Sequence, residues 1–392
     1  MKSIKDELNL KQKKVLLRLD LNVPLDNEKI TDTTRIDKIL PTINFLLKND
    51  AKIIILSHVG RPKGKIVNKL SLKPICEDLK KKLDKKIKLI TKNLKEINSK
   101  DLFSNQDEQI VMIENLRFYQ EEEENNKEFA KHLASLADIY VNDAFSCSHR
   151  AHASIFGITK FLPSYAGLQL TLEINALTKI TSEIKKPVTC IIGGSKISTK
   201  INIIKNLITK FDNIVIVGGM ANNILKYKGH NIGKSIKEEN CDQIIKEIFS
   251  SSQKGNCKII YPEDVAVGKD LNGSAIIKEV NKVCEDELIL DIGPKTIQAI
   301  NKLIEKSETI LWNGPAGYFE NPNFAKGSLE IANKIVEKNK LNSIYSVAGG
   351  GDTVALLNGI DVIDNFDFVS TAGGAFLEYL EGKELPGISA LN

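Results

Sequence analysis

The sequence predicts an α/β protein made of two lobes, each a parallel sheet covered by helices on both faces. Short β-branched runs alternate with longer amphipathic stretches along all 392 residues. These runs are continuously apolar rather than alternating, which is typical of parallel strands buried on both faces. The length also exceeds that of one typical domain and indicates two or three.

The predicted strands are runs rich in valine, isoleucine and leucine. In the first lobe they cover residues 15–19, 52–57, 110–113 and 138–141. In the second lobe they cover residues 187–192, 213–217, 258–261, 288–291, 309–312, 343–347 and 366–370. Helices are expected between them, for example over 34–48 and 198–210, where apolar residues recur at helical spacing.

The two lobes are expected to meet near residues 163–187. Within this segment, residues 168–184 carry apolar side chains at helical spacing and contain no glycine. A rigid connecting helix is therefore predicted, rather than a flexible linker.

Composition excludes several classes of protein. Apolar residues make up 42% and charged residues 27%, which disfavours disorder. A net charge of +5 is mild for this length, so nucleic acid is not an expected partner. No apolar run is long enough for a membrane span, and the run of glutamates at 121–124 is interpreted as a solvated face. The six cysteines show no C-x-x-C spacing, which predicts free thiols, no zinc site and a cytoplasmic location.

Arginine is scarce and clustered. Only five of the 55 basic residues are arginine, and all five lie in the first 150 residues. A chain that uses lysine wherever charge suffices keeps arginine where a planar, bidentate donor is needed. The first lobe is therefore predicted to bind an anion through its arginines.

Polar side chains follow the predicted strands of the first lobe. Because ligands collect at the carboxyl ends of parallel strands, these residues are expected to line one basin for a small anion with more than one phosphate or carboxylate. They are Arg18, Asp20, Asn22, Ser57, His58, Arg61, Glu114, Asn115, Arg117, Asn142, Asp143, His149, Arg150 and His152.

Glycines follow the strands of the second lobe instead. Glycine at a helix N-terminus lets backbone N–H groups approach phosphate oxygens, so this lobe is predicted to hold a nucleotide phosphate tail. The clusters are Gly193–Gly194, Gly218–Gly219, Gly349–Gly350–Gly351 and Gly373–Gly374. Lys196 and Lys200 are predicted to share one helix face, and Asp352 is a candidate Mg²⁺ ligand or helix N-cap.

Other nucleotide-binding and catalytic motifs are missing. The segment 229–235 resembles a Walker A loop but is one residue short, and no G-x-G-x-x-G follows a predicted strand. No strong general base or nucleophile stands out. This favours phosphoryl transfer, where positioning and charge neutralisation dominate.

Nine ordered motifs along essentially the whole chain resemble phosphoglycerate kinase. They are Arg18–Pro24, Ser57–Pro62, Glu114–Phe118, His149–His152, Gly193–Lys196 with Lys200, Asp291–Pro294, Trp312–Glu320, Gly349–Thr353 and Leu380–Pro386. The resemblance implies two Rossmann-like lobes joined by a connecting helix and hinge. It also implies reversible, in-line phosphoryl transfer from 1,3-bisphosphoglycerate to MgADP in glycolysis, with domain closure, by a monomer.

Residue roles follow from the resemblance, position by position. The implied substrate-binding residues for 3-phosphoglycerate and 1,3-bisphosphoglycerate are Asp20, Asn22, Arg35, His58, Gly60, Arg61, Arg117 and Arg150. The implied catalytic residues are Arg35, Lys196 and Lys200. The implied nucleotide-binding residues for ADP and ATP are Gly193, Gly194, Lys200, Gly218, Gly219, Asn313, Pro315, Glu320, Gly349, Gly350, Gly351, Asp352 and Thr353. Asn313 and Pro315 are expected around the adenosine, Glu320 on the ribose, and Asp352 on Mg²⁺. Arg18 is the one arginine that the resemblance does not assign to the anion site, and a strand-packing salt bridge is expected for it.

The same resemblance implies the domain bounds. Residues 1–167 with the tail 378–392 are expected to bind phosphoglycerate, 168–185 to connect, and 186–377 to bind the Mg-nucleotide. One departure concerns Ala372 and Phe376, where the family commonly has glycine and serine. Gly373 and Gly374 are still expected near the nucleotide phosphates.

Two alternatives remain. One is a kinase that forms the acyl phosphate of another carboxylate, and the other is a non-catalytic protein that kept the fold. The arginine set argues against the first. The presence of Arg35, Lys200 and Asp352 argues against the second.

Overall fold

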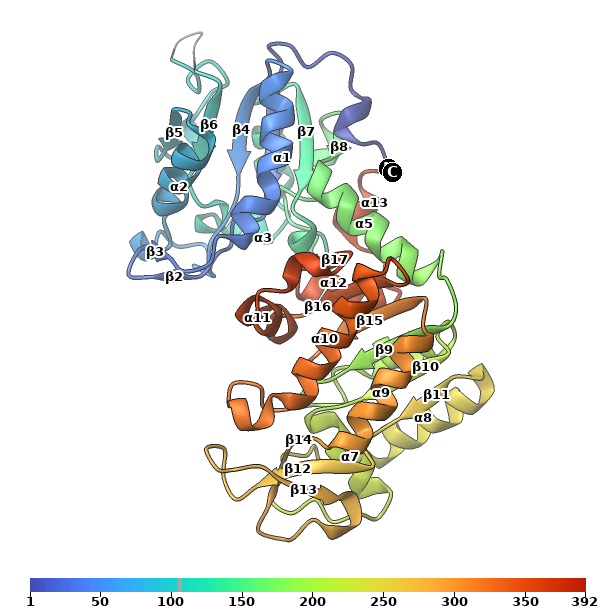
Figure 1. Cartoon of the computed structure of the whole chain (residues 1–392). Coiled ribbons are helices and arrows are strands. Elements are labelled where there is room, and N and C mark those ends of the chain that lie inside the picture. Colours follow the sequence, from blue (N-terminus) through green and yellow to red (C-terminus); the bar gives the residue numbers. More distant parts are fainter. Residues whose placement is uncertain (105–107) are drawn as a thin grey trace. The chain divides into compact units, whose positions relative to one another are not determined.

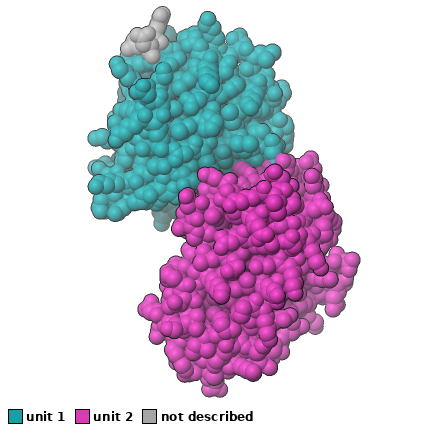
Figure 2. Space-filling view, in the orientation of Figure 1, with its two compact units in different colours: residues 1–175, 384–392 teal, residues 176–383 magenta. Residues whose placement is uncertain are grey.

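The computed structural model describes residues 1–104 and 108–392, which divide into two compact units. Unit 1 comprises Met1–Asn175 with Glu384–Asn392, and unit 2 comprises Ala176–Lys383 (Figures 1 and 2). The boundary falls within helix α5 (Leu168–Thr181), which ends three residues before the predicted end. No helix of the described residues has both the length and the apolar character needed to span a bilayer.

Unit 1 is built on a six-stranded parallel sheet with the order β5-β6-β4-β1-β7-β8. Its strands are β1 (Lys14–Leu19), β4 (Lys52–Leu56), β5 (Ile87–Ile90), β6 (Ile110–Ile113), β7 (Ile139–Asp143) and β8 (Ser164–Ala166). A short hairpin pairs β2 (Leu25–Asp26) with β3 (Lys29–Ile30). The helices are α1 (Thr34–Lys48), α2 (Lys73–Leu83), α3 (Gln120–Glu123), α4 (Lys127–Ala134) and the C-terminal α13 (Pro386–Ser389).

Both faces of this sheet are buried, as continuous apolar strands require. Leu17 and Ile53 belong to one core cluster, whereas their neighbours Leu16 and Ile54 belong to another. Alternate residues of β1 and β4 therefore face opposite cores, and α1 packs against one of them (Figure 1).

Unit 2 contains a second six-stranded parallel sheet with the order β11-β10-β9-β15-β16-β17. Its strands are β9 (Val188–Ile192), β10 (Asn213–Ile216), β11 (Lys258–Ile260), β15 (Thr309–Asn313), β16 (Tyr345–Gly349) and β17 (Phe368–Ser370). The helices are α6 (Ile201–Ile208), α7 (Gly219–Tyr227), α8 (Asp242–Gly255), α9 (Pro294–Lys306), α10 (Lys326–Lys340), α11 (Gly351–Gly359) and α12 (Gly374–Leu380). The single tryptophan, Trp312, is fully buried on β15. The predicted α/β class with two parallel sheets is confirmed.

One prediction about this unit was wrong. The run at 288–291 was expected in a parallel sheet, but β14 (Leu288–Ile292) pairs antiparallel with β12 (Asp264–Gly268). A third strand, β13 (Ile276–Glu279), completes this small sheet (Figure 1). Ile276 and Ile277 are both about half exposed, so this edge strand lacks the buried periodicity from which strands are predicted.

Candidate active site

In unit 1 a chain of hydrogen bonds joins the end of β1 to α1 and to the loop after β4. Arg35, in the first turn of α1, donates from Nη1 to Oδ1 of Asp20 at 3.2 Å and to the carbonyl oxygen of Asn22 at 3.0 Å. The side-chain oxygen of Asn22 accepts from the backbone N–H of Gly60 at 2.9 Å. Four of the predicted substrate-binding residues are thus in direct contact.

Arg117, which follows β6, extends this chain. Its Nη1 donates to the carbonyl oxygen of Gly60 at 3.0 Å, and its Nε lies 3.6 Å from Oε1 of Glu123. This Nε is buried and has no hydrogen-bond partner among residues 1–104 and 108–392. Burial lowers the pKa of the Arg117 guanidinium. A largely buried cation with a donor that makes no hydrogen bond fits an anionic ligand.

Two imidazoles of the basin, those of His58 and His152, are held neutral. Burial and the nearby guanidiniums of Arg18 and Arg117 hold the pKa of His58 well below its usual range. Burial and the charge of Arg117 lower the pKa of His152 to about 4. The basin therefore carries its positive charge on arginine at neutral pH.

The two remaining predicted arginines are exposed at the surface of unit 1. Arg61 follows Gly60 directly and is exposed. Arg150 is also exposed, and its charge contributes to the lowered pKa of His152.

In unit 2 the glycine clusters lie at the carboxyl ends of three strands of the parallel sheet. Gly193–Gly194 follow β9 and Gly218–Gly219 follow β10, whereas Gly349 ends β16 and Gly350–Gly351 follow it. The backbone N–H of Gly193 donates to the carbonyl oxygen of Asn313 at 2.8 Å, and a Cβ at Gly193 would lie 2.4 Å from the Pro315 carbonyl oxygen. These turns approach one another so closely that no larger residue fits at Gly193.

Two of these glycines also adopt a left-handed backbone conformation that favours glycine. Gly218 has φ of 65° and Gly350 has φ of 99°, and they precede α7 and α11 directly. Their left-handed backbone lets each strand turn sharply into its helix, so that the helix N-terminus faces the carboxyl edge of the sheet. Gly373 has φ of 54° and precedes α12 in the same manner.

Lys200 is positioned by Asn313. Its Nζ donates to Oδ1 of Asn313 at 2.5 Å, and Nδ2 of the same amide donates to the carbonyl oxygen of Gly349 at 2.6 Å. Burial lowers the pKa of Lys200, and the carboxylate of Asp352 is among the nearby charges that oppose this shift. Lys200 therefore lies near the Gly194 and Gly349 turns, and the carboxylates of Asp352 and Glu381 both act on its charge.

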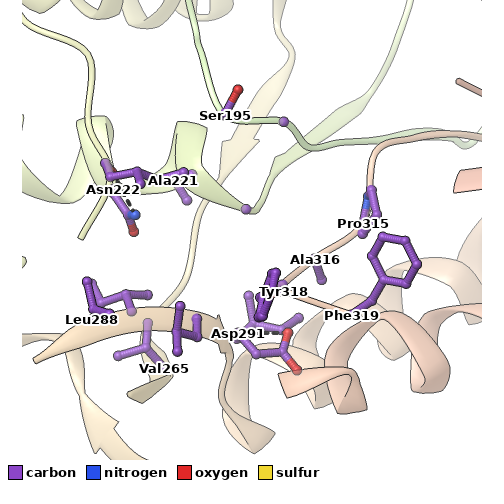
Figure 3. Close-up of a pocket in the computed structure, with 18 of the residues that line it drawn as sticks. Ser195, Ala221, Asn222, Val265, Leu288, Asp291, Pro315, Ala316, Tyr318 and Phe319 are labelled. Carbon is purple, nitrogen blue, oxygen red and sulfur yellow. Dashed lines mark hydrogen bonds between the residues drawn. The ribbon is translucent and has the colours of Figure 1, made fainter. Parts of the chain in front are cut away.

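A cavity of about 340 Å³ lies next to these turns (Figure 3). Six of the predicted nucleotide-binding residues line it: Gly194, Gly218, Gly219, Pro315, Glu320 and Asp352. Its apolar walls include Val265 and Leu288 from the small antiparallel sheet, and Tyr318 and Phe319 beyond β15. An apolar slot with a few polar groups at one end fits a planar heterocycle that carries phosphates.

Asp291, at the end of β14, also lines this cavity (Figure 3). Its carboxylate accepts backbone hydrogen bonds from Ile292 and from Gly327, each at 2.8 Å. Burial nevertheless raises the pKa of Asp291 to about 7. Part of the population is therefore protonated at neutral pH.

The predicted Mg²⁺ ligand, Asp352, fits a site in which one carboxylate and the substrate phosphates hold the metal together. Asp352 is exposed at the cavity, in the first turn of α11. In the part of the chain that the structure describes, no group of three or more His, Cys, Asp or Glu side chains could hold a metal. Mg²⁺ commonly takes one or two carboxylates together with substrate phosphates, which agrees with a single carboxylate here.

One local prediction was wrong, and two other predicted residues have contacts within the protein. Lys196 and Lys200 do not share a helix face, because α6 begins only at Ile201 and both lysines precede it. The hydroxyl of Thr353 is buried and accepts from the backbone N–H of Gly314 at 2.7 Å. Asn313 contacts Lys200 and does not line the cavity.

Two buried groups were not recognised from the sequence. Glu122, interpreted as part of a solvated face, is 1% exposed and accepts a hydrogen bond from the hydroxyl of Ser154. Arg18 was expected in a salt bridge, but its guanidinium is bonded to Ser154 and to His58. Glu122 is the buried residue of helix α3. A four-residue helix is too short for its helical periodicity to be recognised in the sequence.

This fold and these two sites define a two-domain α/β phosphotransferase, with an arginine-lined anion site in one domain and a nucleotide-sized cavity in the other. The sequence profile of phosphoglycerate kinase matches residues 5–383. The chain belongs to the phosphoglycerate kinase family.

Known proteins similar to this chain span its full length. The phosphoglycerate kinase of Chelativorans sp. (strain BNC1) is 43% identical over 392 residues, which cover 100% of this chain and 98% of that protein. The phosphoglycerate kinase of Wolbachia pipientis wMel is 46% identical over 389 residues, covering 98% and 97%.

Solved structures of two phosphoglycerate kinases have the same fold as this chain. Phosphoglycerate kinase from Coxiella burnetii superimposes with a TM-score of 0.91 at 40% identity, covering 99% of this chain and 98% of that one. The enzyme from Pyrococcus horikoshii OT3 gives a TM-score of 0.83 at 28% identity, covering 100% and 98%.

Proposed function

We propose that this protein is a phosphoglycerate kinase that transfers the acyl phosphate of 1,3-bisphosphoglycerate to MgADP, reversibly, giving 3-phosphoglycerate and ATP. The observation that carries the proposal is the fixed position of Lys200. Its ammonium is bonded to Asn313 beside the glycine turns, in a chain that matches the family from end to end.

The arginine-lined basin of unit 1 binds the phosphoglycerate in this proposal. Arg35 and Arg117 are already aligned by Asp20, Asn22 and Gly60, which lowers the entropy lost when an anion binds. The exposed Arg61 and Arg150 complete the set. His58 contributes a neutral imidazole rather than a further charge.

The nucleotide binds in the cavity of unit 2. Its base lies between Leu288 and the segment Pro315–Phe319, its ribose near Glu320, and its phosphates at the glycine turns. Asp352 would hold Mg²⁺ together with the phosphates. The ion, when bound, neutralises phosphate charge during transfer.

The transfer itself needs no general base. An oxygen of the terminal phosphate of ADP attacks the acyl phosphorus, the bond from phosphorus to the carboxyl oxygen breaks, and a carboxylate leaves. Lys200, Lys196 and Arg35 stabilise the charge on the phosphoryl group in flight.

Direct transfer requires the reacting atoms to come within about 3–3.5 Å. We propose that the two domains close on their substrates, with α5 and the segment around Gly373 as hinges. Small-angle scattering should show compaction only when both substrates are bound. Equal radii of gyration with and without the ligand pair would contradict closure.

The enzyme is further proposed to be a monomer located in the cytoplasm. All six cysteines are free thiols, and five of them are buried, as a reducing compartment would leave them. Light scattering after gel filtration measures the oligomeric state.

The test of function is coupled turnover of 3-phosphoglycerate with MgATP. Lys200→Ala and Arg35→Ala should each lower kcat by about 10² or more, because each removes charge stabilisation in the transition state. Lys205→Ala is the matched control, since this lysine lies on α6 and pairs with Glu247 at the surface. A folded wild-type protein that turns over acetate or aspartate but not 3-phosphoglycerate would overturn the proposal.

A further inference from the structure

Arg18 is a buried guanidinium with a full set of partners. It is 1% exposed and lies on β1, at the carboxyl edge of the unit 1 sheet. Nε donates to Oγ of Ser154 at 3.0 Å, Nη1 donates to the carbonyl oxygen of Leu19 at 2.5 Å, and Nη2 contacts Nδ1 of His58 at 3.0 Å. These contacts in three directions fix the plane of the guanidinium, so it has little freedom to rotate.

Glu122 is connected to the guanidinium of Arg18 through Ser154. The hydroxyl of Ser154, which accepts from Arg18, donates its own proton to Oε1 of Glu122 at 2.5 Å. The backbone N–H of Ser154 donates to Oε2 at 2.9 Å. Glu122 is 1% exposed, so the positive charge of Arg18 is matched by a buried carboxyl group across one hydroxyl.

The contact between Arg18 and His58 determines where the imidazole proton resides. A guanidinium has only donors and keeps its protons in proteins. Nδ1 of His58 must therefore be the acceptor, and the ring proton must be on Nε2. Within the described residues Nε2 has no hydrogen-bond partner, so its N–H is available to a ligand.

We propose that Arg18 is a positioning residue that fixes His58 as the neutral Nε2–H tautomer, so that Nε2–H donates to an anionic oxygen of the phosphoglycerate. This inference rests on the proposed function of the basin. Arg18 itself does not touch the substrate.

The charges around His58 favour the same form. Arg18 on β1, Arg117 after β6, His152 after β7 and Arg35 on α1 all disfavour an imidazolium. A neutral donor adds a directed hydrogen bond where a further charge would be repelled. Without Arg18, Nδ1 would lose its donor and one repelling charge, so both tautomers and the protonated ring would become accessible.

The first test is nuclear magnetic resonance on the full chain labelled with ¹⁵N. Two-bond ¹H–¹⁵N correlations distinguish the ring nitrogens of the five histidines, and His58→Gln assigns the His58 signals. The wild type should show a protonated Nε2 and an unprotonated Nδ1 that do not titrate between about pH 5.5 and 8. A protonated Nδ1, or titration near pH 6.5, would overturn the inference whatever the activity is.

The second test uses variants. Arg18→Met should give mixed tautomers and raise the KM for 3-phosphoglycerate about twofold, because only about half of the neutral His58 rings would then carry the proton on Nε2. The KM for MgATP should not change. Because Arg18→Met leaves Glu122 without its cation, Arg18→Met with Glu122→Gln is measured as well.

A third variant separates positioning from mere structural support. The amide nitrogen of Gln lies where Nε2 of histidine lies, so His58→Gln should keep most of the affinity for 3-phosphoglycerate. In that background, Arg18→Met should raise the KM much less than it does in the wild type. An equal increase in both backgrounds would show that Arg18 does not act through His58. A wild-type protein that shows the expected tautomer but does not turn over 3-phosphoglycerate would count against the proposed function. The assignment of the proton to Nε2 would remain valid.

Discussion

The amide of Asn313 links Lys200 to the Gly349 turn. Its oxygen accepts from Nζ of Lys200 at 2.5 Å, and its nitrogen donates to the Gly349 carbonyl oxygen at 2.6 Å. Because the carbonyl can only accept, the amide orientation is determined and its oxygen must face the ammonium. The ammonium is thus held in one place before any nucleotide arrives.

Removing this amide should therefore impair the chemical step. We expect Asn313→Ala to lower kcat by about 10- to 100-fold, since a displacement of about 1 Å of a charge-stabilising group costs on that order. Steady-state kinetics with both substrates varied measures it. An unchanged kcat with a raised KM for the nucleotide would instead support the adenosine contact that the family resemblance implied.

The approach of Gly193 to the turn after β15 leaves no room for a side chain. We expect Gly193→Ala to weaken MgADP binding and to lower the free energy of unfolding by about 1–3 kcal/mol, as overpacking does. The reason is the 2.4 Å that would separate its Cβ from the Pro315 carbonyl oxygen.

Gly359→Ala is the matched control for this substitution. Gly359 ends α11, and a Cβ there would meet nothing within 4 Å. Calorimetric titration with MgADP should therefore give the wild-type affinity for Gly359→Ala. Wild-type affinity for Gly193→Ala as well would show that the turn can move at little cost.

Asp291 should make the stability of unit 2 depend on pH. Its pKa is about 7 in the folded protein, against 3.8 for an aspartate side chain in water, so the folded state binds a proton that the unfolded state releases. Between these values the stability contributed by this group rises as the pH falls. From pH 7 to pH 5 the wild type should gain about 2–3 kcal/mol relative to Asp291→Asn.

Urea unfolding followed by the fluorescence of Trp312 measures this gain, because the single tryptophan lies in the core of unit 2. The comparison with Asp291→Asn cancels the contributions of His58 and His152, whose lowered pKa values act in the opposite direction. Parallel pH profiles for wild type and Asp291→Asn would contradict the prediction.

The sequence predicts the parallel sheets well because their signal is local. The run Ile53–Ile55 is apolar at every position and is fully buried between two cores. The glycine turns are equally local, since φ of 99° at Gly350 demands glycine. These features need no knowledge of distant contacts.

The parts that were missed depend on distant partners. Glu122 is buried because Ser154, 32 residues away, donates two hydrogen bonds to its carboxylate, and a run of four acidic residues gives no sign of it. Asn313 meets Lys200 across 113 residues. The family resemblance supplied the identity of Asn313 and Lys200 but not of Glu122, and the structure supplies the atoms that these residues contact.

Phe376 shows how a departure from the family pattern is accommodated. Its ring is fully buried, and a Cβ at Gly349 would lie 2.6 Å from its Cε1. The ring therefore packs on the backbone of the glycine turn after β16. We expect Phe376→Ser, which restores the common family residue, to lower the free energy of unfolding by about 3–5 kcal/mol, because it leaves a cavity there.

Phe376→Leu is the control for this cavity, because it keeps an apolar side chain and should cost clearly less. Urea unfolding followed by Trp312 fluorescence measures both. If the serine variant lost less than about 1 kcal/mol, the turn would have collapsed onto the vacated space. In that case MgADP binding should weaken, because Gly349 and Gly350 would shift with it. A stable serine variant with unchanged MgADP affinity would show that Phe376 does not support the turn.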